Sequence, residues 1–187
     1  MAIWVTSDFH FNHKNILNTC RKFESIEEHN EYIIKQYNSV VGKDDLVYVL
    51  GDAAWNPLKE SKALIERLHG RKILIIGNHD QGSIGAYKSI GFIDVINHPV
   101  YYSSKIILSH YPVQECYNNP FCINVHGHLH QAVLTLPNYF NCNIELHDFK
   151  PINMKEYEKL ADQICRSTRY EAFTTEWYYS FFKKINN

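Results

Sequence analysis

The chain has 187 residues, of which 45% are apolar, and a formal net charge of −1. This length and composition predict a single domain over residues 1–187, and the absence of basic runs gives no support for stable nucleic-acid binding or for attachment to a membrane surface. We also expect a cytoplasmic protein, because no apolar run could span a bilayer, the N-terminus lacks a signal-peptide pattern, and the five cysteines have no CxxC spacing.

Short apolar runs and helical patterns alternate in the first half of the chain. Residues 2–7, 45–51 and 72–77 have the length and composition of buried strands. Between them, Ser25 and Glu28 form a capping-box start, and Pro57 opens a helical pattern that stops at Gly70. This alternation predicts an α/β fold with parallel strand pairing.

The second half is richer in strand patterns. Residues 92–109 predict two strands around a tight turn at Ser103 and Ser104, residues 121–125 predict another strand, and residues 139–149 predict one more. We therefore expect two sheets.

The C-terminal residues 154–187 predict a helical appendage packed on the domain. A helix is expected over 154–166, and aromatic side chains then follow at helical spacing, namely Tyr170, Phe173, Trp177 and Phe181. Ordinary packing explains such a stripe, while a homo-oligomer contact or a wall of the substrate site are the alternatives.

Polar side chains with metal-ligand chemistry follow five of the predicted strands. In chain order they are Asp8, His10, Asp52, Asn78, His79, Asp80, His110, His126, His128 and His130. A single histidine after a strand is usually a loop or core residue, and a single Gly-Asp pair is usually a turn. Because ligands bind at the carboxyl ends of strands in open α/β sheets, the fivefold repetition predicts one shared site.

The residue types narrow the choice of metal. Carboxylate, imidazole and amide ligands without cysteine suit Mn²⁺, Fe²⁺, Zn²⁺ or Ni²⁺. Seven candidate ligands exceed the needs of one ion and fit two ions about 3.5–4 Å apart. If residues 126–130 are extended, His128 and His130 point to the same side, with Cα atoms about 6.6–6.8 Å apart.

Residues 3–157 resemble the calcineurin-like metallophosphoesterase superfamily in five motifs: SDFH, LGD, GNHD, SH and GHLH. They resemble its small prokaryotic and phage-type branch more loosely. The resemblance implies a four-layer α/β/β/α sandwich of two mixed sheets flanked by helices, with a dinuclear site at the carboxyl ends of the strands. The sequence differs from the protein Ser/Thr phosphatases of the superfamily, because its GDAAWNP segment lacks the arginine of their G-D-x-x-D-R-G motif.

The resemblance also implies a role for each matching residue. One metal would be held by Asp8, His10 and His130, the other by Asn78, His110 and His128, with Asp52 bridging them. His79 would bind no metal and would face the substrate phosphate.

Chemistry then makes His79 the candidate proton donor to the leaving oxygen, oriented by Asp80 or by a backbone carbonyl. His13 and Arg21 are further candidates for substrate contact, and Arg21 could grip a phosphate oxygen. The alternatives are a surface arginine and a structural histidine, and a structural role is also expected for His126.

These residues predict a metal-dependent phosphoesterase that uses a hydroxide held between two divalent ions, most readily Mn²⁺. By analogy with small members of the superfamily we expect a phosphodiesterase that acts on a nucleotide or another small phosphodiester. The alternatives are a phosphomonoesterase that acts on a small molecule or a nucleic-acid end, and a non-catalytic metal-binding scaffold. The scaffold would not need His79, and a decayed site would have gaps among its ligands.

Overall fold

The computed structural model describes residues 1–55, 57–117, 119 and 121–166. The predicted aromatic stripe beyond residue 166 lies outside this part of the chain. In the described part, no helix is both long enough and apolar enough to cross a membrane.

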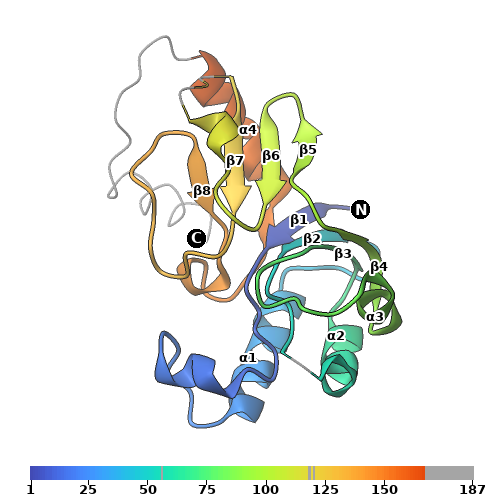
Figure 1. Cartoon of the computed structure of the whole chain (residues 1–187). Helices are drawn as coiled ribbons and strands as arrows, with labels where there is room; N and C mark the ends of the chain where they lie inside the picture. Colours follow the sequence, from blue (N-terminus) through green and yellow to red (C-terminus); the bar gives the residue numbers. More distant parts are fainter. Residues whose placement is uncertain (56, 118, 120, 167–187) are drawn as a thin grey trace.

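The first sheet contains five strands in the order β4-β3-β2-β1-β9. The strands are β1 (Ile3–Thr6), β2 (Leu46–Leu50), β3 (Arg71–Ile75), β4 (Phe92–Ile96) and β9 (Ile152–Asn153). The first four run parallel, and β9 pairs antiparallel with β1. Figure 1 shows helices α1 (Ile26–Asn38), α2 (Lys62–Arg67) and α3 (Ile84–Ser89) on one side of this sheet.

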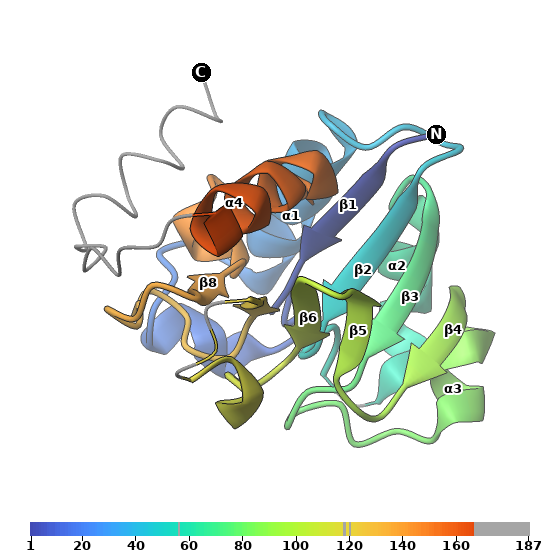
Figure 2. The same cartoon turned by 90° about the horizontal axis from the view of Figure 1, so that it is seen from above.

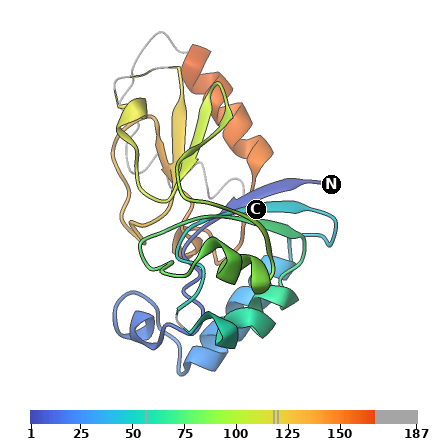
Figure 3. The ribbon, with the colours of Figure 1, turned by 45° about the vertical axis from the view of Figure 1, so that its right-hand side comes forward.

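The second sheet lies on the other side of the first, as Figure 3 shows. Its order is β5-β6-β7-β8, and its strands are β5 (Val100–Ser103), β6 (Ile106–Ser109), β7 (Ile123–His126) and β8 (Tyr139–Asn141). β5 pairs antiparallel with β6, and the other pairs are parallel. Short 3-10 helices are η1 (Lys14–Asn18), η2 (Leu58–Ser61), η3 (Gln114–Cys116) and η4 (Ile144–Leu146).

The predicted α/β fold with two mixed sheets and flanking helices is confirmed. Two details differ from the expectation. Residues 92–96 belong to the first sheet, where α3 allows β4 to return parallel to β3, so residues 92–109 form three strands. Residues 139–149 form the short strand β8 followed by η4, because Asn143 caps a helical turn by accepting from the Glu145 N–H.

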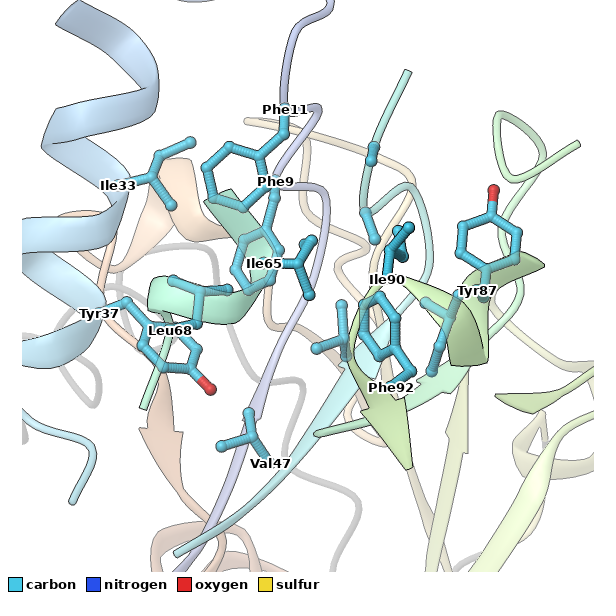
Figure 4. Close-up of a cluster of buried hydrophobic side chains, with 14 of the residues drawn as sticks. Phe9, Phe11, Ile33, Tyr37, Val47, Ile65, Leu68, Tyr87, Ile90 and Phe92 are labelled. Carbon is cyan, nitrogen blue, oxygen red and sulfur yellow. The ribbon is translucent and has the colours of Figure 1, made fainter. Parts of the chain in front are cut away.

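Two main cores hold these layers together. In the first, residues of α1, α2 and α3 pack against the outer face of the first sheet, with Phe9, Tyr37 and Phe92 among its large side chains (Figure 4). The second lies between the sheets and includes the inner face of α4 (Met154–Arg166), which is the face expected from the sequence. Each fully buried large side chain contributes about 1.5–3 kcal/mol of hydrophobic stabilisation.

Helix α1 begins where the capping pattern predicts. The Ser25 hydroxyl accepts a hydrogen bond from the Glu28 N–H at 3.1 Å. Figure 2 shows the carboxyl ends of β1, β2 and β3 pointing the same way, as expected for parallel strands. The loops that leave these ends therefore meet near the junction of the two sheets.

Candidate metal centre

The loops after β1, β2, β3, β6 and β7 carry the seven candidate ligands to one place. Backbone hydrogen bonds join these loops directly: the Asp8 N–H donates to the Gly51 carbonyl, the His10 N–H to the Asp52 carbonyl, and the Gly127 N–H to the His110 carbonyl. The loops predicted to converge at the strand ends are thus held together by their own backbone hydrogen bonds.

Five candidate ligands have left-handed backbone conformations. The φ angles are 59° at Asp8, 52° at His10, 52° at Asp52, 69° at His128 and 49° at His130. Asp and His adopt this region more readily than most residues, yet each such position costs about 1–3 kcal/mol. Strain of this size collects where a fixed side-chain direction is needed for function.

The condition that residues 126–130 are extended throughout is not met. Strand β7 ends at His126, and the Leu129 N–H donates to the Gly127 carbonyl at 2.8 Å, which closes a tight turn around His128. The two histidines consequently diverge. His128 Nδ1 lies 2.9 Å from Asn78 Oδ1, whereas His130 Nδ1 lies 2.9 Å from Glu145 Oε1.

The candidate ligands form two groups that share Asp52. Ligand atoms of Asp8, His10 and His130 lie within 4.8 Å of one another. In the second group, Asn78 Oδ1 is 2.8 Å from His110 Nε2 and close to His128. Asp52 Oδ2 is 3.6 Å from both His10 Nε2 and His110 Nε2, so one carboxylate oxygen faces both groups.

The chemistry of these groups fits a pair of divalent cations. Asp8 Oδ1 and His10 Nε2 are buried and have no hydrogen-bond partner in the part of the chain that the structure describes. Buried polar atoms are rarely left without a partner, so these two atoms fit a cation. Burial raises the pKa of Asp8 to about 6 and lowers the pKa values of His10 and His128, which keeps the imidazole lone pairs available for metal binding.

Glu145 is a residue of this centre that the sequence did not reveal. Its Oε1 accepts hydrogen bonds from His130 Nδ1 and from Arg21 Nε at 2.9 and 2.8 Å. Burial lowers the pKa of His130, but hydrogen bonds with Cys20 and Glu145 outweigh it and raise that pKa to about 10. A carboxylate that binds one nitrogen of a metal-ligating histidine directs the other nitrogen toward the metal. This general pairing was the only reason to expect a residue such as Glu145 near the centre.

Arg21 is buried with its guanidinium bonded to other groups of the chain, which favours a structural role over the expected grip on a substrate phosphate. The residue is only 2% exposed. Its guanidinium donates to the backbone carbonyls of Asp8 and Phe9 and to Glu145. Arg21 therefore fixes the loop that carries Asp8.

Asp80 binds backbone N–H groups of the loops that carry the candidate ligands. Its buried carboxylate accepts the backbone N–H groups of Gly77, Asp52 and Ala53 at 2.9, 2.7 and 3.0 Å. These bonds hold the turns of the LGD and GNHD motifs together, so Asp80 positions Asp52, and its expected orientation of the His79 ring stays a prediction. The His79 N–H itself donates to Asp52 Oδ1 at 2.8 Å.

Aromatic and imidazole rings border the centre beside His10. His13 stacks on Trp55 with ring centroids 3.9 Å apart, and its Nδ1 lies 3.1 Å from His10 Nδ1. The half-buried His79 lies 5.3 Å from both the Trp55 and the His10 ring. His13 thus lies beside the centre as expected, whereas no motif in the sequence pointed to Trp55.

His126 is buried beneath the second group of candidate ligands, and its Nδ1 donates to the Gly127 carbonyl at 2.9 Å. Gly127 is required there for space, since a Cβ atom would lie 2.5 Å from Asp8 Oδ2. The GHLH motif therefore includes packing constraints as well as ligands.

Comparison with known proteins gives a consistent result. The family model for calcineurin-like phosphoesterases matches residues 1–175. An uncharacterised protein of Methanocaldococcus jannaschii is 32% identical over 176 residues, which cover 86% of this chain and 92% of that protein. The gene 66 protein of Mycobacterium phage L5 is 30% identical over 162 residues, 70% of this chain and 78% of that protein.

Among solved structures, a protein of unknown function from Aquifex aeolicus superposes with a TM-score of 0.66 and 27% identity, covering 85% of this chain and 98% of that one. The family implies a dinuclear divalent metal site, and the two ligand groups described above supply candidates for it. The chain belongs to the calcineurin-like phosphoesterase family and is a metal-dependent phosphoesterase.

Proposed function

We propose that the protein is a phosphodiesterase that acts on a nucleotide or another small phosphodiester and uses two divalent ions, preferably Mn²⁺. The observation that carries this proposal is the position of Asp52, whose Oδ2 faces His10 and His110 at equal distances of 3.6 Å. In this proposal Asp8, His10 and His130 hold one ion, Asn78, His110 and His128 hold the other, and Asp52 serves both.

The two ions would supply charge neutralisation for the phosphate and a lowered pKa for a bound water. The remaining work falls to the side chains of the chain itself. Asp80 and Arg21 hold the loops of Asp52 and Asp8 in place through backbone hydrogen bonds. Because these contacts exist before a substrate arrives, little reorganisation is needed during the reaction.

His79 is the proposed proton donor to the leaving oxygen. Its backbone is fixed by Asp52, and its ring lies beside His10, His13 and Trp55 at the border of the centre. Positioned acids of this kind contribute about 10²–10⁴-fold to a rate.

The pairing of Arg21 favours a diester over a monoester. A monoester carries up to two negative charges, and a second charge is commonly held by an arginine fork. Here the Arg21 guanidinium is buried and engaged with Glu145 and two carbonyls, so it is not available to a substrate. A diester, with one charge, makes the smaller demand.

The test compares bis-p-nitrophenyl phosphate with p-nitrophenyl phosphate on protein dialysed against chelator and then loaded with Mn²⁺. We expect no hydrolysis before loading and a higher kcat/KM for the diester afterwards. Full activity of the metal-free protein would refute the metal-dependent mechanism, and a preference for the monoester would refute the diesterase assignment. A His69→Gln variant, changed away from the centre, is the matched control.

A further inference from the structure

A pocket of about 170 Å³ opens beside the candidate metal centre, on the side of the second ligand group. It lies between the end of β3, the connection from β4 to β5, and the residues that follow β6. Its lining includes Ile76, Asn97, Pro99, His110 and Tyr111. The pocket therefore shares a wall, His110, with the proposed binding site of one metal.

Tyr111 lines this pocket and also contacts two candidate ligands of the metal centre. Its ring lies 4.4 Å from the His128 ring and 5.0 Å from the His110 ring, yet the residue remains 48% exposed. A phosphate held at the centre would thus have a partly open aromatic ring next to it. Trp55, on the opposite side, is already stacked by His13.

Hydrogen bonds with Ser109 and Asn124 fix the backbone around Tyr111. The Ser109 hydroxyl donates to the Tyr111 carbonyl at 2.6 Å, and the Asn124 side chain bonds to Ser109 Oγ and to the Val113 N–H. On the opposite wall the Ile76 N–H donates to the Ile96 carbonyl. A pocket whose walls are held in this way loses little freedom when it is filled, which favours affinity.

The lining combines apolar and polar groups. Ile76, Pro99 and the Tyr111 ring present apolar surface, while the exposed Asn97 offers an amide donor and acceptor. His98 also lines the pocket; its Nδ1 donates to the Pro99 carbonyl, which leaves Nε2 as its second hydrogen-bonding atom. A flat heterocycle with polar edges matches this combination, because its faces can contact the apolar surface while its edge can form hydrogen bonds with the Asn97 amide.

We propose that Tyr111 and this pocket bind the base of a nucleotide whose phosphate occupies the metal centre. The proposal rests on the phosphodiesterase function above and specifies its substrate class. Stacking of one base on an aromatic side chain is worth about 1–3 kcal/mol, and 1.4 kcal/mol corresponds to a tenfold change in affinity.

The experiment measures inhibition by AMP and by ribose 5-phosphate, which share a phosphate and differ in the base. Initial rates of methyl p-nitrophenyl phosphate hydrolysis by the Mn²⁺-loaded protein provide the readout. We expect AMP to inhibit about tenfold more strongly than ribose 5-phosphate. Tyr111→Phe should keep most of this ratio, and Tyr111→Ala should bring it close to one.

Tyr101→Ala is the matched control, because Tyr101 is an exposed tyrosine on β5 that does not line the pocket. It should leave the ratio unchanged. Equal inhibition by both compounds in the wild type, or a ratio that survives Tyr111→Ala, overturns the proposal. Absence of methyl p-nitrophenyl phosphate hydrolysis would instead count against the phosphodiesterase function, and direct binding of the same two compounds would then test the pocket.

Discussion

Asp52 is the residue on which both halves of the candidate metal centre depend. One of its oxygens faces His10 and His110, and the other accepts the His79 N–H. The same carboxylate therefore links two proposed metal sites to the proposed proton donor. Asp80 holds the Asp52 backbone, so a change at Asp80 would act through Asp52.

Asp52→Asn should weaken the binding of both metals together, because a negatively charged carboxylate that serves both sites is replaced by a neutral amide. We expect fewer than two metals per chain after loading and gel filtration, measured by elemental analysis. A His10→Ala variant should lose mainly one metal and serves as the comparison. Normal loading of two metals in Asp52→Asn would show that Asp52 does not bridge.

His79 and His128 distinguish a proton donor from a ligand. His128→Ala should lower metal content, with partial recovery of activity at high Mn²⁺. His79→Ala should keep two metals and lose about 10²–10⁴-fold in kcat for an alkoxide leaving group. The loss should be much smaller for p-nitrophenolate, which leaves without a proton. An equal loss for both leaving groups, or rescue by Mn²⁺, would transfer the role to another group, with His13 tested first.

At the scale of the element, the carboxyl ends of the strands determine which candidate ligands lie close together. Strand β3 also carries a buried charged side chain. Lys72 is 5% exposed, and its ammonium donates to the carbonyls of Leu68 and Gly70 at 2.8 and 3.0 Å, beyond the end of α2. Burial lowers the pKa of Lys72 from 10.5 to about 8.

This shift predicts that the contribution of Lys72 to stability rises with pH between about 8 and 10.5. In that range the unfolded chain keeps a proton on Lys72 that the folded chain has lost, so the free energy of unfolding increases by an amount on the order of 2 kcal/mol. Urea unfolding across this range, followed by far-UV circular dichroism, measures it. Lys72→Met should remove the increase, with exposed Lys59→Met as control; an identical pH slope in Lys72→Met would contradict the prediction.

At the scale of the whole molecule, the proposed metal centre joins the two sheets. Asp8, His10, Asp52 and Asn78 follow strands of the first sheet, while His110, His128 and His130 follow strands of the second. Metal bound there would connect both sheets in the folded state, and the separated unfolded segments could not reproduce that site.

Mn²⁺ should therefore raise the melting temperature. At a free concentration of about 100 Kd, one site adds about 2.7 kcal/mol, and each kcal/mol corresponds to about 2–4 °C for a chain of this size. We expect a rise of about 5–10 °C in differential scanning calorimetry relative to chelator-treated protein. Asp52→Asn should show a smaller rise. The same melting temperature with and without Mn²⁺ would show that no metal binds between the sheets.

The sequence by itself determined the α/β class, the strands β1, β2, β3, β6 and β7, the helix over 154–166, and the convergence of polar residues at the strand ends. These features follow from local patterns, because strand and helix periodicity, caps and breakers act over a few neighbouring residues. The direction of the parallel strands then brings their ends to one edge without further information.

The tertiary structure alone decided which way each side chain turns and what it meets. Arg21 pairs with Glu145 across 124 residues, and Cys20 meets His130 across 110, so no local pattern could reveal these contacts. The left-handed conformations at His128 and His130 arise because the turn must fit against Asp8 and Asn78, which outweighs the extended preference of the segment. The place of Tyr111 beside both the metal centre and the pocket was also decided by the tertiary structure, since the end of β3 and the β4–β5 connection that complete the pocket come from other segments of the chain.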